Sequence, residues 1–496
     1  MFKKNNWAIL VILALAAFFR FYKFFEFQYF SGDEEFLAAT IRHIIWDRSP
    51  TLLVGNANLG FGLGPFYHYL LTPFYFIFKF DLINLQAIAS CLGIATTYII
   101  YLAGKEIDGK KLGLTAAFIY AASFFIALFD RRLVHLTLNP IMTAMTLFGL
   151  IKVVKKDYRY IPLLAVPIGF AFHEDASLLV LAIAIGLTWI VYRLPLKNKY
   201  VLFGGLILLV FAAPIIAAEF YYHGAVSGPL LQSLLRPFNQ EFSAQAIALY
   251  NPLEMINTFA RVLLTAPSQF IEQHFCYCQP PMALFTPIGQ IIIGLAFVTS
   301  WFTRKRPGSI VWIMFLSLII SVYFYNQIFK ANFFQHYLMN FFPVLAVILA
   351  QAVLVWQKKL PVLTYGLLSI YLIINLVTLQ QSAVKYPLIE KINLVKQSTE
   401  AIGNDTYSIE SSDDGYIHGG GWTELYTLYF RPANKSYHYD FWGWIYAAYS
   451  LYPPMPVGNP AKTVSIYRQG ETPNLSKELI KSYSFKDIKI DIFQNE

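Results

Sequence analysis

Eleven apolar runs, separated by short polar loops, dominate this sequence and restrict it to few folds. An apolar run of about 20 residues is long enough to cross about 30 Å of hydrocarbon as a helix. Charged residues make up only 14% of the chain, against roughly a quarter in soluble domains. We therefore predict an α-helical polytopic membrane protein with about 11 transmembrane helices. The predicted spans are residues 7–24, 84–104, 111–128, 137–154, 160–172, 176–192, 200–219, 285–303, 309–326, 335–356 and 361–380.

Two parts of this assignment have alternatives. Lys3 and Lys4 before an apolar run also resemble a cleaved signal peptide, with Ala14-Leu15-Ala16 as the cleavage site. The apolar stretch before that triplet is very short, so we predict that the first span is a retained anchor. Runs 160–172 and 176–192 are short, and they could instead form one broken span or a re-entrant pair.

Basic residues lie in alternate loops, and this pattern gives the orientation. Such loops face the cytoplasm, so we predict a plasma (inner) membrane protein with a cytoplasmic N-terminus and a C-terminal domain outside. The net charge of +9 is divided among these loops, so nucleic acid is not an expected partner, whereas membrane lipids are. The loop residues are Lys3, Lys4, Lys105, Lys110, Lys111, Lys152, Lys155, Lys156, Arg159, Arg193, Lys197, Lys199, Arg304, Lys305, Arg306, Lys358 and Lys359.

The outer side holds the longest polar segments, so we expect the chemistry there. Outer loops 25–83 and 220–284 belong to a transmembrane domain over residues 1–380, and both are expected to carry interfacial helices. The aromatic stretch 66–80 is too short to cross and suits the headgroup level. Residues 381–496 are polar and are predicted to form a small extracytoplasmic α/β domain. Its expected elements are a helix over 387–402 and strands over 462–468 and 484–493.

Three consecutive acids, Asp33, Glu34 and Glu35, follow the first span on the outer side. Ser31 with Glu34 three residues later is a capping box, and this pattern predicts a helix that begins here and runs to about Asp47. A carboxylate at a helix start beside a wet surface cavity is also well placed to act as a general base. Both interpretations can hold together.

Two further outer segments carry ionisable side chains. Arg131 and Arg132 either snorkel to lipid headgroups or clamp a phosphate, and arginine in a short outer loop runs against the positive-inside pattern. In the turn His173-Glu174-Asp175, Asp175 either caps the next helix or faces a wet cavity with its neighbours. His336 begins a later span on the same side.

No cofactor is predicted from known motifs. His274, Cys276 and Cys278 are spaced like metal ligands, but a fourth ligand is not evident. The sequence has no Gly-x-x-x-x-Gly-Lys-Ser/Thr loop and no Gly-x-Ser-x-Gly elbow, which excludes a P-loop ATPase and disfavours a serine esterase. Asp33, Glu34 and Asp175 offer ligands for a divalent cation.

In the order of its motifs the chain resembles the GT-C glycosyltransferases, in particular the protein O-mannosyltransferase family and its bacterial relative, the lipid A aminoarabinose transferase. The resemblance covers roughly residues 7–380. It rests on Asp33-Glu34 after the first span, on Gly-Pro-Phe-Tyr-x-Tyr-Leu at 64–70, on an arginine and an Asn-Pro at 132–140, and on His-Tyr-Leu at 336–338. Family members often carry a lysine before the proline of the first-loop motif, but here that residue is Gly64.

The resemblance implies a transferase that moves a hexosyl or pentosyl group from a polyprenyl-phosphate donor to a hydroxyl of a protein, lipid or glycan, with inversion. Asp33 would be the base, and Glu34 would support it or hold the acceptor. Arg131 or Arg132, with His173, would stabilise the leaving phosphate. Tyr67, Asp175 and His336 are candidate substrate contacts. The resemblance requires no metal.

Two other classes of protein compete with this interpretation. A transporter or flippase of lipid-linked sugars usually shows inverted repeats and ionisable residues at the membrane midplane, whereas here they gather at the outer surface. A structural or polymer-ligating membrane protein without its own donor site would not need Asp33.

Overall fold

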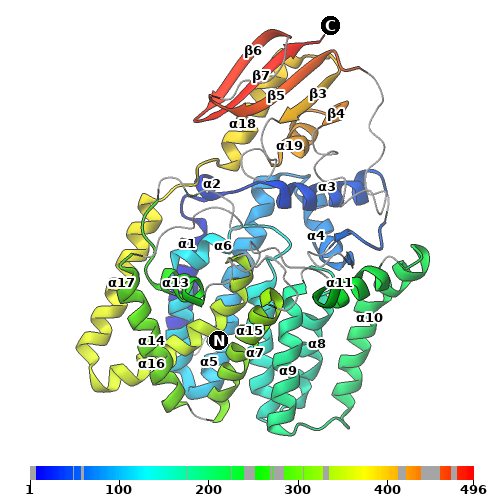
Figure 1. Cartoon of the computed structure of the whole chain (residues 1–496). Coiled ribbons are helices and arrows are strands. Elements are labelled where there is room, and N and C mark those ends of the chain that lie inside the picture. Colours follow the sequence, from blue (N-terminus) through cyan, green and yellow to red (C-terminus); the bar gives the residue numbers. More distant parts are fainter. Residues whose placement is uncertain are drawn as a thin grey trace.

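The computed structural model places a small α/β domain on one end of a helical bundle, with a layer of short helices between them (Figure 1). It describes residues 7–48, 50–56, 61–174, 176–224, 226–239, 252–268, 271, 284–304, 306–327, 335–411, 420–436, 459–470 and 477–495. This arrangement confirms the predicted fold class.

Each predicted span is occupied by helix. The bundle contains α1 (Trp7–Phe21), α5 (Leu82–Ala122), α6 (Phe124–Phe129), α7 (Asn139–Val154), α8 (Ile161–Phe170), α9 (Leu179–Tyr192), α10 (Lys199–Tyr221), α14 (Thr286–Thr303), α15 (Ser309–Gln327), α16 (Phe342–Lys359) and α17 (Pro361–Gln381). Helix α16 lies at its centre, because all its residues from Phe342 to Ala350 are buried. Among the described residues, five helices are long and apolar enough to cross a membrane, so the number of eleven crossings stays a prediction.

The long element α5 is two helices that meet at a tight reversal. Asp108 and Gly109 leave the helical conformation, and Gly109 has a φ of +84°. A Cβ on Gly104 would lie 2.8 Å from the Cα of Gly113, although nine residues of straight helix span about 13 Å. The chain therefore folds back here, as expected from the separate spans 84–104 and 111–128.

The short helices α8 and α9 are separate elements with different neighbours. Helix α8 packs against α7 and α10, whereas α9 packs mainly against α15. This arrangement favours two spans over a single broken one.

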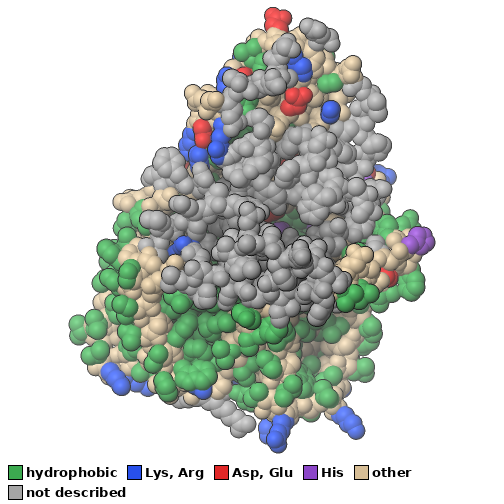
Figure 2. Space-filling model, in the orientation of Figure 1, with side chains coloured by type: hydrophobic (Ala, Val, Ile, Leu, Met, Phe, Trp, Pro, Cys, Tyr) green, Lys and Arg blue, Asp and Glu red, His purple; other side chains and the backbone are tan. Residues whose placement is uncertain are grey.

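The outer surface of the bundle exposes apolar side chains: Phe220, Phe302 and Val362 are each at least 78% accessible. Figure 2 shows a belt of hydrophobic side chains on this face, with Lys and Arg at the end remote from the α/β domain, as a membrane protein requires.

Short helices of the described residues form the layer on the α/β side of the bundle (Figure 1). The predicted helix after the acidic triplet is α3, and the predicted interfacial helix is α4. Between them β1 and β2 form a short antiparallel pair. The bounds are α2 (Phe24–Phe27), α3 (Gly32–Trp46), β1 (Gly55–Asn56), β2 (Gly62–Leu63), α4 (Phe66–Ile77), α11 (Ser227–Asn239) and α13 (Pro252–Leu263).

The C-terminal domain is a five-stranded mixed sheet with the order β4-β3-β5-β7-β6, in which β3 runs parallel to β4 and β5. One predicted strand was wrong in its bounds. The alternating stretch 484–493 is divided by a turn at Lys486, whose φ is +54°, so its first residues end β6. The elements are α18 (Leu388–Ile402), β3 (Tyr407–Ser411), α19 (Trp422–Tyr429), β4 (Lys435–Ser436), β5 (Lys462–Arg468), β6 (Glu478–Phe485) and β7 (Ile488–Gln494).

Candidate active site

The capping box at the start of α3 forms as predicted. The backbone N–H of Ser31 donates to Oε2 of Glu34 at 3.0 Å, and the Ser31 hydroxyl donates to the same oxygen at 2.7 Å. The N–H of Glu35 donates to the carbonyl of Ser31 at 2.8 Å. The first turn of α3, which carries all three acids, is therefore firmly held.

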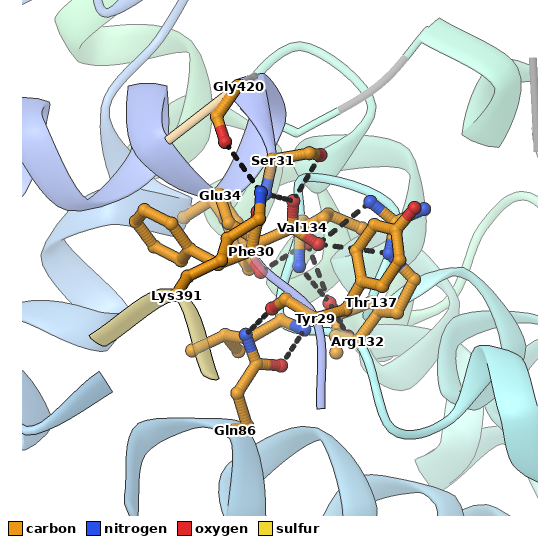
Figure 3. A network of polar contacts seen from close by, with 12 residues as sticks. Tyr29, Phe30, Ser31, Glu34, Gln86, Arg132, Val134, Thr137, Lys391 and Gly420 are labelled. Atoms are coloured by element: carbon orange, nitrogen blue, oxygen red, sulfur yellow. Dashed lines mark hydrogen bonds and ion pairs between the residues drawn. The ribbon is translucent and has the colours of Figure 1, made fainter. Parts of the chain in front are cut away.

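Glu34 also forms a buried ion pair with Arg132. Both Nε and Nη2 of Arg132 donate to Oε1 of Glu34, at 2.9 and 2.7 Å (Figure 3). The guanidinium lies 4.7 Å from the centre of the Tyr29 ring. The side chains of Glu34 and Arg132 are only 2% and 12% exposed. The second outer loop and the start of α3 are thus joined by a charged contact that excludes water.

Asp33 differs from its two acidic neighbours. It is half-buried, and its carboxylate has no hydrogen-bond or ion-pair partner within the described part of the chain. Glu35, in contrast, is fully buried and accepts two backbone N–H bonds from the C-terminal domain. One carboxylate of the triplet is therefore left for chemistry, while the other two fix the helix that carries it.

Arg131 points into the protein. Its Nη2 donates to the carbonyl of Phe19, in the last turn of α1, at 2.5 Å and to that of Tyr22, just after α1, at 2.9 Å. Its guanidinium lies 4.5 Å from the centre of the Phe27 ring. Burial, with the charge of Arg20, lowers the pKa of Arg131 to about 9. The residue satisfies helix-end carbonyls, and its role in phosphate binding stays a prediction.

A second buried ion pair supports the same loop. Arg20 donates from Nη2 to Oδ2 of Asp130 at 2.5 Å, and a Cβ on Gly93 would lie 2.5 Å from both Arg20 Nε and Asp130 Oδ2.

We expect Gly93→Ala to lower the free energy of unfolding by about 3 kcal/mol, because a buried pair pushed apart leaves uncompensated charge. The thermal midpoint in detergent measures this, and Gly186→Ala, with open space around it, is the control. Equal midpoints for the two variants would contradict the expectation.

His173 is held on both sides of its ring. Nε2–H donates to the carbonyl of Phe211 at 2.7 Å, and Nδ1 accepts from the N–H of Phe66 at 3.3 Å. A Cβ on Gly64 would overlap the ring, so the imidazole occupies the place where a side chain before Pro65 would begin. Burial lowers the pKa of His173 to about 4. A neutral, fully engaged imidazole favours a structural role, and stabilisation of the leaving phosphate by His173 stays a prediction.

This environment has a consequence for stability against pH. Because the folded pKa of His173 lies near 4 and that of a free histidine near 6.5, the unfolded chain binds more protons between these values. Stability from His173 is therefore complete above about pH 6.5 and lost as the pH falls toward 4, in total on the order of 3 kcal/mol. We expect the thermal midpoint in detergent to fall over this range, and less so in His173→Gln. An equal fall of the thermal midpoint with pH in His173→Gln and in the wild type would contradict this expectation.

The other predicted substrate contacts divide into two groups. The Tyr67 hydroxyl is buried and donates to the carbonyl of Val134 at 2.5 Å, which ties α4 to the loop of Arg132. The Thr137 hydroxyl lies 2.8 Å from the carbonyl of Arg132 and completes that loop. Asp175 lies outside the described residues, as does the side chain of His336, whose backbone belongs to η4 (Gln335–Phe341).

His68 on α4 is a candidate site residue that the sequence analysis did not identify. It is only 4% exposed, and neither ring nitrogen has a hydrogen-bond partner among the described residues. Its ring lies edge-on to Phe36, 6.0 Å between centroids, one turn beyond Asp33 on α3. Burial, with the nearby His135 and His173, lowers the pKa of His68 to about 3. The sequence feature that could have indicated His68 is its position as a polar residue inside an apolar, aromatic helix.

A metal centre finds no support in the described residues, where no three His, Cys, Asp or Glu side chains are grouped as ligands. His274, Cys276 and Cys278 lie outside them.

Comparison with known proteins gives one family model and several similar folds. Residues 63–217 match the family model described as dolichyl-phosphate-mannose-protein mannosyltransferase. The fold is similar to that of ArnT from Cupriavidus metallidurans bound to undecaprenyl phosphate, with a TM-score of 0.61 and 11% identity, over 99% of this chain and 98% of that one. The apo form of ArnT gives the same values. No curated protein matches the sequence.

A weaker similarity, with a TM-score of 0.44 and 15% identity, is to the oligosaccharyltransferase of Archaeoglobus fulgidus, over 87% of this chain and 64% of that one. At 11% identity the likeness to ArnT shows the fold alone, and the family model adds the sequence pattern of the α4 to α10 region. The chain therefore has a fold similar to that of ArnT and, over residues 63–217, the sequence pattern of the mannosyltransferase family model.

Proposed function

We propose that the protein transfers a sugar from a polyprenyl-phosphate donor to a hydroxyl group of a protein, lipid or glycan acceptor on the outer face of the membrane. The observation that carries the proposal is that the three carboxylates at the start of α3 differ in their contacts. Glu34 and Glu35 make structural contacts, whereas the half-buried Asp33 has a carboxylate without a hydrogen-bond or ion-pair partner among the described residues.

The reaction needs few groups. Asp33 takes the proton of the acceptor hydroxyl as its oxygen attacks the anomeric carbon. The bond from that carbon to the phosphate oxygen breaks, and the polyprenyl phosphate leaves with the electron pair. Attack from the face opposite the leaving group inverts the configuration. The donor is already activated by its phosphate, so the chain needs no nucleotide site.

Charge develops on the phosphate as it leaves, and two described side chains suit it. Arg132 carries a guanidinium with a fixed orientation, because Glu34 and the Tyr29 ring hold it. His68 offers an N–H without a hydrogen-bond partner among the described residues, from a helix that packs against α3. Donors that are held in place before reaction stabilise such charge without reorganisation. We assign phosphate binding to this pair, and the undecaprenyl phosphate in the ArnT structure supports a donor of this class.

A flippase of lipid-linked sugars is the second candidate. The alternation of spans is compatible with a flippase, but Asp33 and His68 belong to α3 and α4, in the layer beside the C-terminal domain (Figure 1), whereas transporters place such groups at the membrane midplane. The deciding experiment supplies labelled polyprenyl-phosphate sugars to purified protein with peptide, lipid and glycan acceptors. Sugar on an acceptor supports the transferase. Donor that crosses the bilayer of reconstituted vesicles without transfer supports the flippase.

A further inference from the structure

Glu35 is the best-buried carboxylate of the acidic triplet, and its partners lie in the C-terminal domain. Its Oε2 accepts from the N–H of Gly421 and its Oε1 from that of Glu424, both at 2.9 Å. These N–H groups belong to the first turn of α19, which carry the positive end of the helix dipole. The N-cap residue of α19 is Gly421, which has no side chain to accept them. Glu35 therefore supplies, from the membrane domain, the cap that α19 lacks.

A second contact continues along the same face of α3. Arg42 lies seven residues after Glu35, two helical turns away and on the same side. Its Nε and Nη2 donate to the two carboxylate oxygens of Glu424 at 2.7 and 3.1 Å. The side chain of Glu424 is only 1% exposed, and a two-point bond of this kind fixes both position and angle. Helices α3 and α19 thus hold each other at two points.

A third contact fixes the chain just before α3. The ammonium group of Lys391, on α18, donates to the carbonyl of Phe30 at 2.9 Å and to that of Gly420 at 3.0 Å (Figure 3). Lys391 is 3% exposed. At the start of α18, the N–H of Leu388 donates to the carbonyl of Gln28 at 3.0 Å. Residues 28–30 are therefore anchored to α18 as α3 is to α19.

Gly421 permits the close approach. A Cβ there would overlap the ring of Phe30, and the residue has a φ of +96°, which only glycine adopts readily. Gly470 is a natural control, because it has a φ of +104° but nothing within 4 Å of a Cβ. Alanine at these two positions costs a similar backbone strain, and only Gly421→Ala also pushes the two domains apart.

We infer that the C-terminal domain positions the catalytic base, with Glu35 as the positioning residue, and that transfer requires this domain to be docked. Asp33 directly precedes two anchored residues in the first turn of α3. Glu34 is held by the bundle through Arg132, and Glu35 is held by the C-terminal domain. Release of either anchor lets the first turn of α3 rotate, and a small displacement of a base lowers the rate of proton transfer strongly. The inference rests on the proposed function.

The test compares Glu35→Gln and Gly421→Ala with Gly470→Ala in transfer of labelled sugar from a polyprenyl-phosphate donor. We expect kcat to fall 10- to 100-fold in the first two variants, because the amide of Glu35→Gln cannot accept both N–H bonds and the Cβ of Gly421→Ala overlaps the Phe30 ring. The KM for the donor should stay within about twofold, because the phosphate site does not involve these residues. Gly470→Ala should match the wild type.

The outcomes separate this inference from the proposed function. Wild-type kcat in Glu35→Gln and in Gly421→Ala, with transfer intact, overturns the positioning role alone. A parallel loss of donor binding and of the thermal midpoint in both variants also overturns it, since a general structural role then suffices. If Glu35→Gln does not fold, the kcat of Gly421→Ala compared with that of Gly470→Ala decides whether the positioning role holds. Failure of the wild type to transfer any sugar refutes the proposed function itself.

Discussion

Asp33→Asn is expected to lower kcat by about 10² to 10⁴, because an amide cannot take the proton of the acceptor hydroxyl. Folding should be unaffected, since in the described structure the Asp33 carboxylate holds no other group in place. Donor affinity should also persist, because the residues assigned to the phosphate, Arg132 and His68, are unchanged. The measurement is sugar transfer from a polyprenyl-phosphate donor under single-turnover conditions, together with donor binding and the thermal midpoint.

Asp47→Asn is the matched control for this variant. It removes a carboxylate from the other end of the same helix, where Asp47 pairs with His43, and it should leave transfer unchanged. Transfer that survives in Asp33→Asn would place the base elsewhere, with Asp175 as the next candidate. Transfer lost together with donor binding would instead make Asp33 a binding residue.

The helices of the bundle could be predicted from the sequence because their signal is local. An apolar run between basic loops is sufficient, and even the reversal at Gly109 coincides with a predicted basic loop. The strand over 484–493 was extended too far because alternation continues across the turn at Lys486. A positive φ at a lysine leaves no mark in the pattern of apolar residues.

The acidic triplet could be identified from the sequence, but the roles of its members could not be separated. Glu35 finds its partners 386 and 389 residues further along the chain, and no local pattern encodes such a contact. The same holds for His173, whose ring occupies the space beside Gly64. Buried ionisable residues in an apolar sequence indicate that a polar partner exists, without indicating which residue it is.

The Glu34–Arg132 pair allows a sharper test, because its structural and chemical roles can be separated. Arg132→Gln alone should lower the free energy of unfolding by about 3 to 5 kcal/mol, since it leaves the Glu34 carboxylate buried beside a neutral amide. It should also lower kcat by about 10² to 10³, the usual cost of one lost donor to a developing charge. A single variant cannot divide these two effects.

The double variant Glu34→Gln/Arg132→Gln divides them. Two amides can hydrogen-bond to each other without a buried charge, so we expect the thermal midpoint to recover most of its loss. Transfer should stay low, because no guanidinium faces the leaving phosphate. Recovery of stability without recovery of kcat would make Arg132 a catalytic group, and recovery of both would limit the pair to holding α3 against the second outer loop. Double-mutant coupling near zero in stability would contradict the ion pair itself.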